Sequence, residues 1–217
     1  MPYIEASARH RQLVAAARIA LAREGVGNTS LRAVAAEAGV PLGTMQYVFP
    51  SKELLLRAVL EDVIEETAEV FRAAADLDGG LEHALRRGIA EFWSRLVEGR
   101  GNMQVIQHEL TYHALRSAGM EGLARWQYER YGAVVADWCQ QAAQRAGESC
   151  AVPFAQLARL VVANLDGLVM QYVSDPHPAR SRQDLEAVTE MLVALAGVRG
   201  DGVVAADRAG RPYGKKR

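Results

Sequence analysis

One short segment of the 217-residue sequence, residues 41–49, combines polar and aromatic residues at a spacing suited to recognition chemistry. If it is helical, Met45, Val48 and Phe49 share one side, because positions i, i+3 and i+4 are neighbours on a helix. The opposite side then presents four residues outward: Leu42, Gly43, Gln46 and Tyr47. A glutamine amide can hydrogen-bond an adenine edge, a tyrosine offers a ring and a hydroxyl, and glycine lets a sugar-phosphate backbone come close.

Two preceding helices are expected to hold this face in place. Apolar residues repeat at helical spacing from Leu13 to Leu21, and the pattern stops at Glu24-Gly25. A second helix is expected over residues 30–38, capped by Thr29 or Ser30. Gly39 suits the left-handed turn that ends it, and Pro41 suits the start of the next helix. A helix, a glycine turn and a second helix with an outward polar face predict a helix-turn-helix that enters the DNA major groove.

The sequence here reads "TSLRAVAAEAGVPLGTMQYVFPSKELL", and over about residues 9–60 it resembles the TetR family of bacterial transcriptional regulators. The resemblance implies that Tyr47 contacts DNA, that Thr44 contacts phosphate or sugar, and that Lys52 clamps a phosphate. It also implies that Arg32, early in the second helix, reads a base. Gln46 and Val48 depart from the usual aromatic and histidine of the family, which concerns the operator sequence rather than the mode of binding.

Helical periodicity continues along the chain, so the sequence predicts an all-α fold of about nine helices. A long helix is expected from Ser51 to about residues 78–80, and further helices at about 81–98, 102–117, 120–146, 153–174 and 182–196. No stretch alternates with period two for long enough to predict a strand. We expect a three-helix DNA-binding domain (1–52), a helical ligand-binding and dimerisation domain (53–197) and a flexible basic tail (198–217).

The resemblance also implies what the second domain does. In the TetR family the last two long helices pair across a two-fold axis, and their other faces line a pocket. The candidate ligand-binding residues are Trp93, Met103, Gln107, Thr111, Trp126, Tyr131, Trp138, Asn164 and Gln171. The candidate dimerisation residues are Val169, Val188, Met191, Leu192 and Leu195. We expect a mostly apolar, aromatic or polycyclic effector to lower operator affinity, with the helix after Ser51 as the lever.

Charge and residue usage narrow the class of protein. Residues 1–52 hold six Lys and Arg against three Asp and Glu, while the net charge of the chain is −1. A basic head on an acidic body indicates that the head meets an anion. Cys139 and Cys150 are expected to be free thiols in a reducing cytoplasm, and neither a signal peptide nor a membrane span is predicted.

No cofactor, catalytic or metal motif emerges from the sequence. His108 and His113 are five residues apart, which places them on different sides of a helix. Three classes of function remain open. The first is a ligand-responsive repressor that binds a palindromic operator as a homodimer. The second is a small-molecule sensor or carrier with a vestigial DNA-binding head. The third is a cofactor-free enzyme that uses His108, Glu109 or Tyr112.

Overall fold

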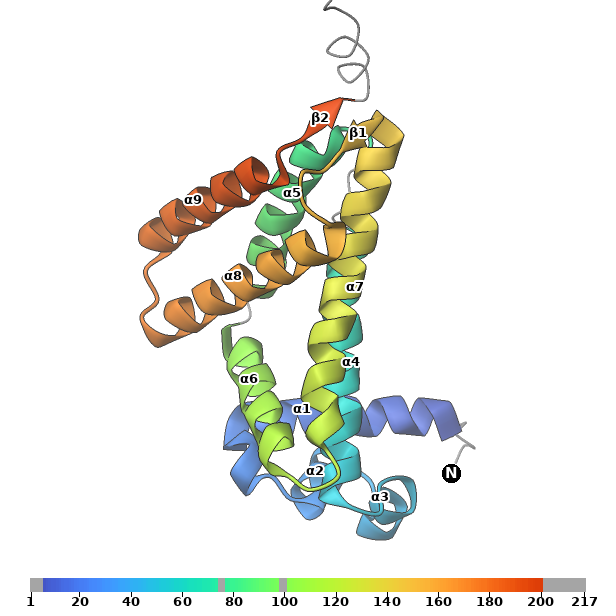
Figure 1. Cartoon of the computed structure of the whole chain (residues 1–217). Coiled ribbons are helices and arrows are strands. Elements are labelled where there is room, and N and C mark those ends of the chain that lie inside the picture. The colour runs from blue at the N-terminus through green and yellow to red at the C-terminus, as the bar shows by residue number, and fades with distance from the viewer. Residues whose placement is uncertain (1–5, 74–76, 98–100, 201–217) are drawn as a thin grey trace, which may run out of the picture.

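The computed structural model describes residues 6–73, 77–97 and 101–200, and the prediction of an all-α fold is confirmed. Within these ranges the chain forms nine α-helices, a π-helical turn and one pair of very short strands (Figure 1). Their bounds are α1 (Ala6–Asn28), α2 (Leu31–Glu37), α3 (Leu42–Val48), α4 (Lys52–Ala73), α5 (Gly80–Phe92), η1 (Trp93–Val97), α6 (Gly101–Arg116), α7 (Glu121–Ala146), β1 (Glu148–Ser149), α8 (Phe154–Ser174), α9 (Pro178–Ala196) and β2 (Arg199–Gly200).

Helices α1 to α3 form a head at one end of the molecule (Figure 1). The side chain of Gln12 in α1 donates to the carbonyl of Ala38 at 2.9 Å, and the ring of His10 lies 4.9 Å from that of Phe49. Ser30 caps α2 by accepting from the amide of Ala33 at 3.2 Å. Helix α1 therefore fixes the ends of both shorter helices.

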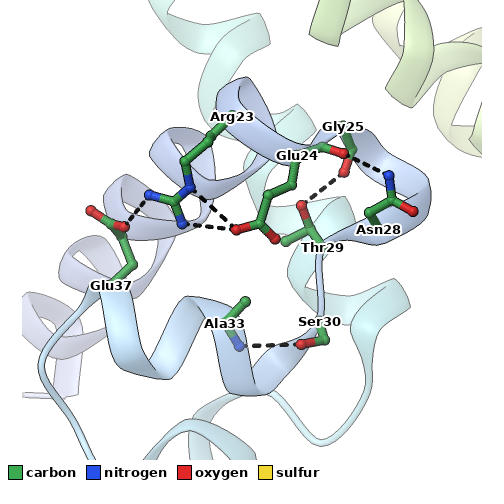
Figure 2. Close-up of polar contacts among 8 residues, drawn as sticks. All are labelled: Arg23, Glu24, Gly25, Asn28, Thr29, Ser30, Ala33 and Glu37. Atoms are coloured by element: carbon green, nitrogen blue, oxygen red, sulfur yellow. Dashed lines mark hydrogen bonds and ion pairs between the residues drawn. The ribbon is translucent and has the colours of Figure 1, made fainter.

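The end of α1 is broken at Gly25, where the sequence predicts that the first helix stops. Gly25 has φ +76° and ψ 165°, a backbone conformation that residues other than glycine rarely adopt. Its carbonyl accepts from the hydroxyl of Thr29 at 2.8 Å, and Arg23 bridges Glu24 to Glu37 (Figure 2). These contacts hold the bend that carries the chain from α1 into α2.

Two long helices, α4 and α7, lie side by side and extend from the head to the far end of the body (Figure 1). Helix α7 packs against α4, α5, α6 and α8, so its different sides face different neighbours. One apolar core joins the head to the nearer part of the body, and it includes Leu13, Val34, Leu60 and Leu110. A second core fills the farther part, among α5, α7, α8 and α9. The head thus shares its core with α4 and α6.

The chain after α9 differs from the sequence prediction in one detail. We expected no strand and a flexible tail from residue 198. Instead β2 pairs antiparallel with β1, with Glu148 opposite Gly200 and Ser149 opposite Arg199. Two-residue strands carry too little periodicity to be found from sequence. The remaining tail residues, 201–217, lie outside the described residues.

Candidate functional site

Helix α3 is held by its inner side, as the spacing of its apolar residues predicts. Met45 is fully buried and Phe49 is 3% exposed, and both lie in the same core as Val34 of α2. The turn between α2 and α3 is closed by Gly39, with φ +65°, and by the amide of Val40 donating to the carbonyl of Ala35 at 3.0 Å. The inner contacts and the turn together set the angle at which α3 is presented.

The outer side of α3 faces solvent. Tyr47 is 89% exposed, and Gly43 and Gln46 are exposed beside it. Leu42 and Thr44 are half-buried at the start of the helix. The inner side of α3 is therefore buried in the head, while its polar and aromatic outer side is accessible to a partner.

Lys52 lies at the start of α4, next to this surface. Its ammonium group donates to the carbonyl of Gly27 at 3.1 Å, which ties α4 to the bend between α1 and α2. Ser51 caps α4 by accepting from the amide of Leu54 at 3.2 Å. Arg32 is exposed at the start of α2. Both cations stand in the head that the charge distribution singles out.

A cavity of about 520 Å³ opens between α6, α7 and α8. Its apolar wall includes Leu115, Val162 and Met170, and Tyr112 and Tyr128 add aromatic surface. Arg159 lies at its edge and is exposed. A volume in this range suits a small organic molecule, and such sites are apolar with a few polar groups that orient the ligand.

Three polar side chains join the helices at this cavity. Asp166 of α8 accepts from the hydroxyl of Tyr128 at 2.7 Å, and its other oxygen lies 3.2 Å from Nε2 of His108. The second ring nitrogen of His108, Nδ1, lies 2.8 Å from the carbonyl oxygen of Gln104. Because both ring nitrogens face acceptors, the protonated imidazolium is the form that fits.

The electrostatics of this cluster agree with its geometry. The Asp166 carboxylate raises the pKa of His108 above its usual value, against the effect of burial. Burial alone would raise the pKa of Asp166, but the contacts from His108 and Tyr128 outweigh it and lower that pKa. Burial and the same carboxylate raise the pKa of the Tyr128 phenol. Both pKa shifts therefore favour the charged forms of His108 and Asp166, in agreement with the 3.2 Å distance between them.

A smaller space of about 20 Å³, the inner chamber, adjoins the cavity and shares Val162 and Asp166 with it. Its lining comes from α4, α5, α6, α7 and α8. The further lining residues are Thr67, Phe92, Gln104, Gln107, Tyr131, Leu165 and Val169. Tyr131 is 5% exposed, and its hydroxyl is a buried polar group in this chamber.

The sequence was compared with known protein families. The family model described as "Bacterial regulatory proteins, tetR family" matches residues 13–59, which span α1, α2, α3 and the start of α4. The chain carries the DNA-binding domain of the TetR family. It is therefore a DNA-binding transcriptional regulator rather than an enzyme, and the resemblance noted in the sequence is confirmed.

Similarity extends well beyond the head. The chain is 26% identical over 190 residues to the HTH-type nicotine-responsive transcriptional repressor HdnoR of Paenarthrobacter nicotinovorans, covering 88% of this regulator and 96% of HdnoR. It is 29% identical to the multidrug binding protein EbrR complexed with ethidium, with a TM-score of 0.65 over 87% of this chain and 98% of EbrR. A putative transcriptional regulator from Pseudomonas aeruginosa PAO1, 24% identical, shares the fold with a TM-score of 0.69 over 88% of this chain and 93% of that one.

The candidate ligand-binding residues are spread over several places. Thr111 lines the larger cavity, and Gln107 and Tyr131 line the inner chamber. Trp138 lines another hollow, on the side of α7 that faces α4, and Trp93 packs its ring edge-on to Tyr172 at 5.6 Å.

Three further candidates, Trp126, Asn164 and Gln171, do not line either space. Trp126 is 36% exposed, and Gln171 is exposed. Asn164 donates to the carbonyl of Leu160 one helical turn earlier, at 2.8 Å. The side chain of Met103 lies outside the described residues.

Sequence reasoning missed the polar cluster of the cavity. His108 was considered only as a metal ligand or catalytic group, while Asp166 and Tyr128 were not assigned to the ligand site. The signal that links them is weak, because the three residues lie on three helices and are far apart in sequence. Asp166, an acid within the apolar run of α8, was the one visible hint.

The candidate dimerisation residues differ in how far their side chains are exposed. Val169 and Leu192 are each 1% exposed, so their side chains pack within the protomer. Met191 is 51% exposed, and Val188 and Leu195 are half-buried beside it on α9. Helices α8 and α9 lie next to each other and project from one side of the body (Figure 1).

Cys139 and Cys150 are free, and burial raises the pKa of the Cys139 thiol. None of the described helices is long and apolar enough to cross a membrane.

The ion pair gives a testable pH dependence. Since the folded state favours charged His108, the pair stabilises the fold fully below the unfolded pKa of about 6.5, and this contribution is lost as pH rises through the higher folded value. We expect an NMR titration of His108 to have its midpoint above 6.5, and Asp166→Asn to lower that midpoint. The control is Asp175→Asn, which removes an exposed acid paired with Arg180 and should not move it. A midpoint that ignored Asp166→Asn would contradict the pair.

Proposed function

We propose that this regulator is a repressor that binds a two-fold symmetric operator as a homodimer and leaves it when a small molecule enters the cavity between α6, α7 and α8. It acts in the cytoplasm, where the DNA is. The observation that carries the proposal is the pairing, in one chain, of an exposed reading helix with a cavity whose walls touch the elements that hold that helix. Similarity to HdnoR, a nicotine-responsive repressor, supports the ligand-responsive class.

The DNA-contacting face consists of α3 and the helix starts beside it. Tyr47, Gln46 and Gly43 provide the exposed surface that enters the major groove. Thr44 and Lys52 lie beside this surface, so they contact the phosphates, with Lys52 exchanging the carbonyl of Gly27 for a phosphate oxygen. Leu42 supports the start of α3, and Arg32 approaches from α2. Affinity should therefore fall as salt rises.

The route between the sites runs through α6, rather than through α4 alone as the sequence suggested. His108 of α6 faces the cavity, while the next residue, Glu109, reaches the head. The carboxylate of Glu109 accepts from the amide of Val26 at 2.9 Å, directly after the break at Gly25. A ligand that shifts α6 at His108 therefore also moves the contact between Glu109 and Val26, which holds the bend of α1.

The proposed function is tested with DNA from the regulator's own surroundings. Fluorescence anisotropy should detect binding to the duplex beside its gene, with affinity that falls as salt is raised, and much weaker binding to a shuffled duplex of the same composition. Equal binding to both duplexes would contradict a specific operator. No binding to either would favour a sensor or carrier with a vestigial head.

The contact of Glu109 gives a sharper prediction. Glu109→Ala leaves the amide of Val26 without its acceptor, so the head loses its fixed angle, and we expect operator affinity to fall about fivefold or more. Glu109→Gln keeps an acceptor oxygen and should bind nearly as the unmodified protein does. Glu61→Ala removes a surface acid paired with Arg57 and serves as the control. If Glu109→Ala bound the operator normally and responded normally to ligand, α6 would not be the route.

A further inference from the structure

The inner chamber contains a buried donor that the fold does not use. The hydroxyl of Tyr131 makes no hydrogen bond within the part of the chain that the structure describes, although the residue is 5% exposed. Burial raises the pKa of the Tyr131 phenol, and the neighbouring hydroxyl of Thr67 offsets part of that rise, although it donates its own proton to the carbonyl of Val63 at 2.9 Å. A buried hydroxyl without a partner is costly, and such groups mark places where another molecule supplies the partner.

The size of the chamber limits what can reach this hydroxyl. A volume of about 20 Å³ has room for about one water molecule, so it can hold a single heavy atom of a ligand. The larger cavity of about 520 Å³ adjoins it and shares Val162 and Asp166 with it. For a ligand in the larger cavity to reach Tyr131, one of its atoms must pass the shared wall at Val162 and Asp166, while its body rests on apolar surface.

The charge of that atom is limited by Asp166. Its negative charge is already balanced by His108, whose Nε2 lies 3.2 Å from one carboxylate oxygen, and Tyr128 donates to the other oxygen at 2.7 Å, so a cationic group gains little there. An anionic group would be repelled by the same carboxylate, which also lines the chamber. A neutral atom with a lone pair meets neither penalty.

We propose that the effector is an aromatic or otherwise apolar molecule with one neutral hydrogen-bond acceptor, a carbonyl oxygen or an aromatic ring nitrogen, which accepts from Tyr131 in the inner chamber. The body of the ligand packs against Leu115, Val162 and Met170 in the larger cavity. Tyr131 is thus the residue that selects ligands by their acceptor. The inference rests on the proposed function, since it assigns the chemistry of the same effector site.

Four probes with the same two-ring body separate the possibilities. Benzophenone has a neutral carbonyl, diphenylmethane has no acceptor, benzhydrylamine is a cation and diphenylacetate is an anion. Calorimetric titration of the full chain should give the tightest binding with benzophenone, by about two- to tenfold over diphenylmethane. If benzophenone failed to bind, or if either charged probe bound more tightly, the proposed acceptor would be wrong.

Substitution at Tyr131 tests the residue itself. Tyr131→Phe should remove the preference for benzophenone over diphenylmethane, and it should leave the midpoint of thermal unfolding unchanged or raised, because a buried unpaired hydroxyl is removed. Tyr172→Phe removes the hydroxyl of a tyrosine that lines neither space and should keep the preference. A clear fall in thermal stability of Tyr131→Phe would show that the hydroxyl has a structural partner and would overturn the proposal.

The proposed function can fail separately from this inference. Tyr131→Phe and the unmodified protein should bind operator DNA equally in the absence of ligand, since Tyr131 lies on α7 of the body and not in the head that carries α3. Normal operator binding combined with no preference among the probes would reject the acceptor alone. Loss of operator binding in the unmodified protein would reject the proposed function.

Discussion

Met191→Arg is expected to convert the regulator from a dimer to a monomer at micromolar concentration. Met191 is 51% exposed on α9, between Val188 and Leu195, and a guanidinium there would be buried without a partner in a two-fold interface. Because a monomer holds only one half-site, affinity for a two-half-site operator should drop about a hundredfold or more. Sedimentation and anisotropy measure the two effects.

The choice of residue matters for this experiment. Leu192 is 1% exposed within the protomer, so Leu192→Arg would test folding rather than assembly. Glu186→Arg is the matched control, since it places the same guanidinium at an exposed position on a different side of α9. If Met191→Arg remained a dimer while its fold was intact, the interface would lie elsewhere.

Tyr47→Ala is expected to weaken binding to the operator about 5- to 150-fold, which corresponds to the loss of one good contact at a base. The side chain is 89% exposed and contributes little to the core of the head, so the variant should fold normally. Its affinity for a shuffled duplex should change much less, because phosphate contacts remain. Anisotropy titrations against both duplexes measure the difference.

Another exposed tyrosine provides the control for Tyr47. Tyr112→Ala removes a side chain that is 58% exposed but lies on α6 at the ligand cavity. Operator affinity of this variant should stay close to that of the unmodified protein. Equal losses in both variants would mean that α3 does not carry the specific contact.

The head could be predicted from sequence because its signals are local. Gly39 and Pro41 are separated by a single residue and decide where α2 ends and α3 begins. The inner side of α3 then follows from the spacing of Met45 and Phe49 alone, and both are buried as expected. The break in α1 was also visible, since Gly25 can adopt a positive φ that other residues avoid.

The ligand cavity could not be placed in the same way. Helix α7 has neighbours on several sides, so an aromatic pattern along it does not reveal which side borders a cavity. Tyr131 faces the inner chamber, whereas Trp138, seven residues later, lines a different hollow. The pairing of His108 with Asp166 depends on how α6 and α8 pack, and no local pattern encodes it.

The dimer surface shows a further limit of periodicity. The stripe of Val188, Met191, Leu192 and Leu195 is apolar throughout, but an apolar stripe does not distinguish contacts within a chain from contacts between chains. In the fold Leu192 packs inward, and Met191 remains on the surface. The ion pair of Arg86 with Glu190 joins α9 to α5 and helps to set this orientation.

The central claim is that the head reads a symmetric DNA site, and selection from a pool of random duplexes tests it most directly. The unmodified protein should enrich an inverted repeat whose half-site centres are about one helical turn, or a multiple of it, apart. Tyr47→Ala, carried through the same selection, should enrich that repeat weakly or not at all. If the unmodified protein enriched no sequence over the starting pool, or only a single half-site without symmetry, the account of a dimeric operator-binding regulator would be contradicted.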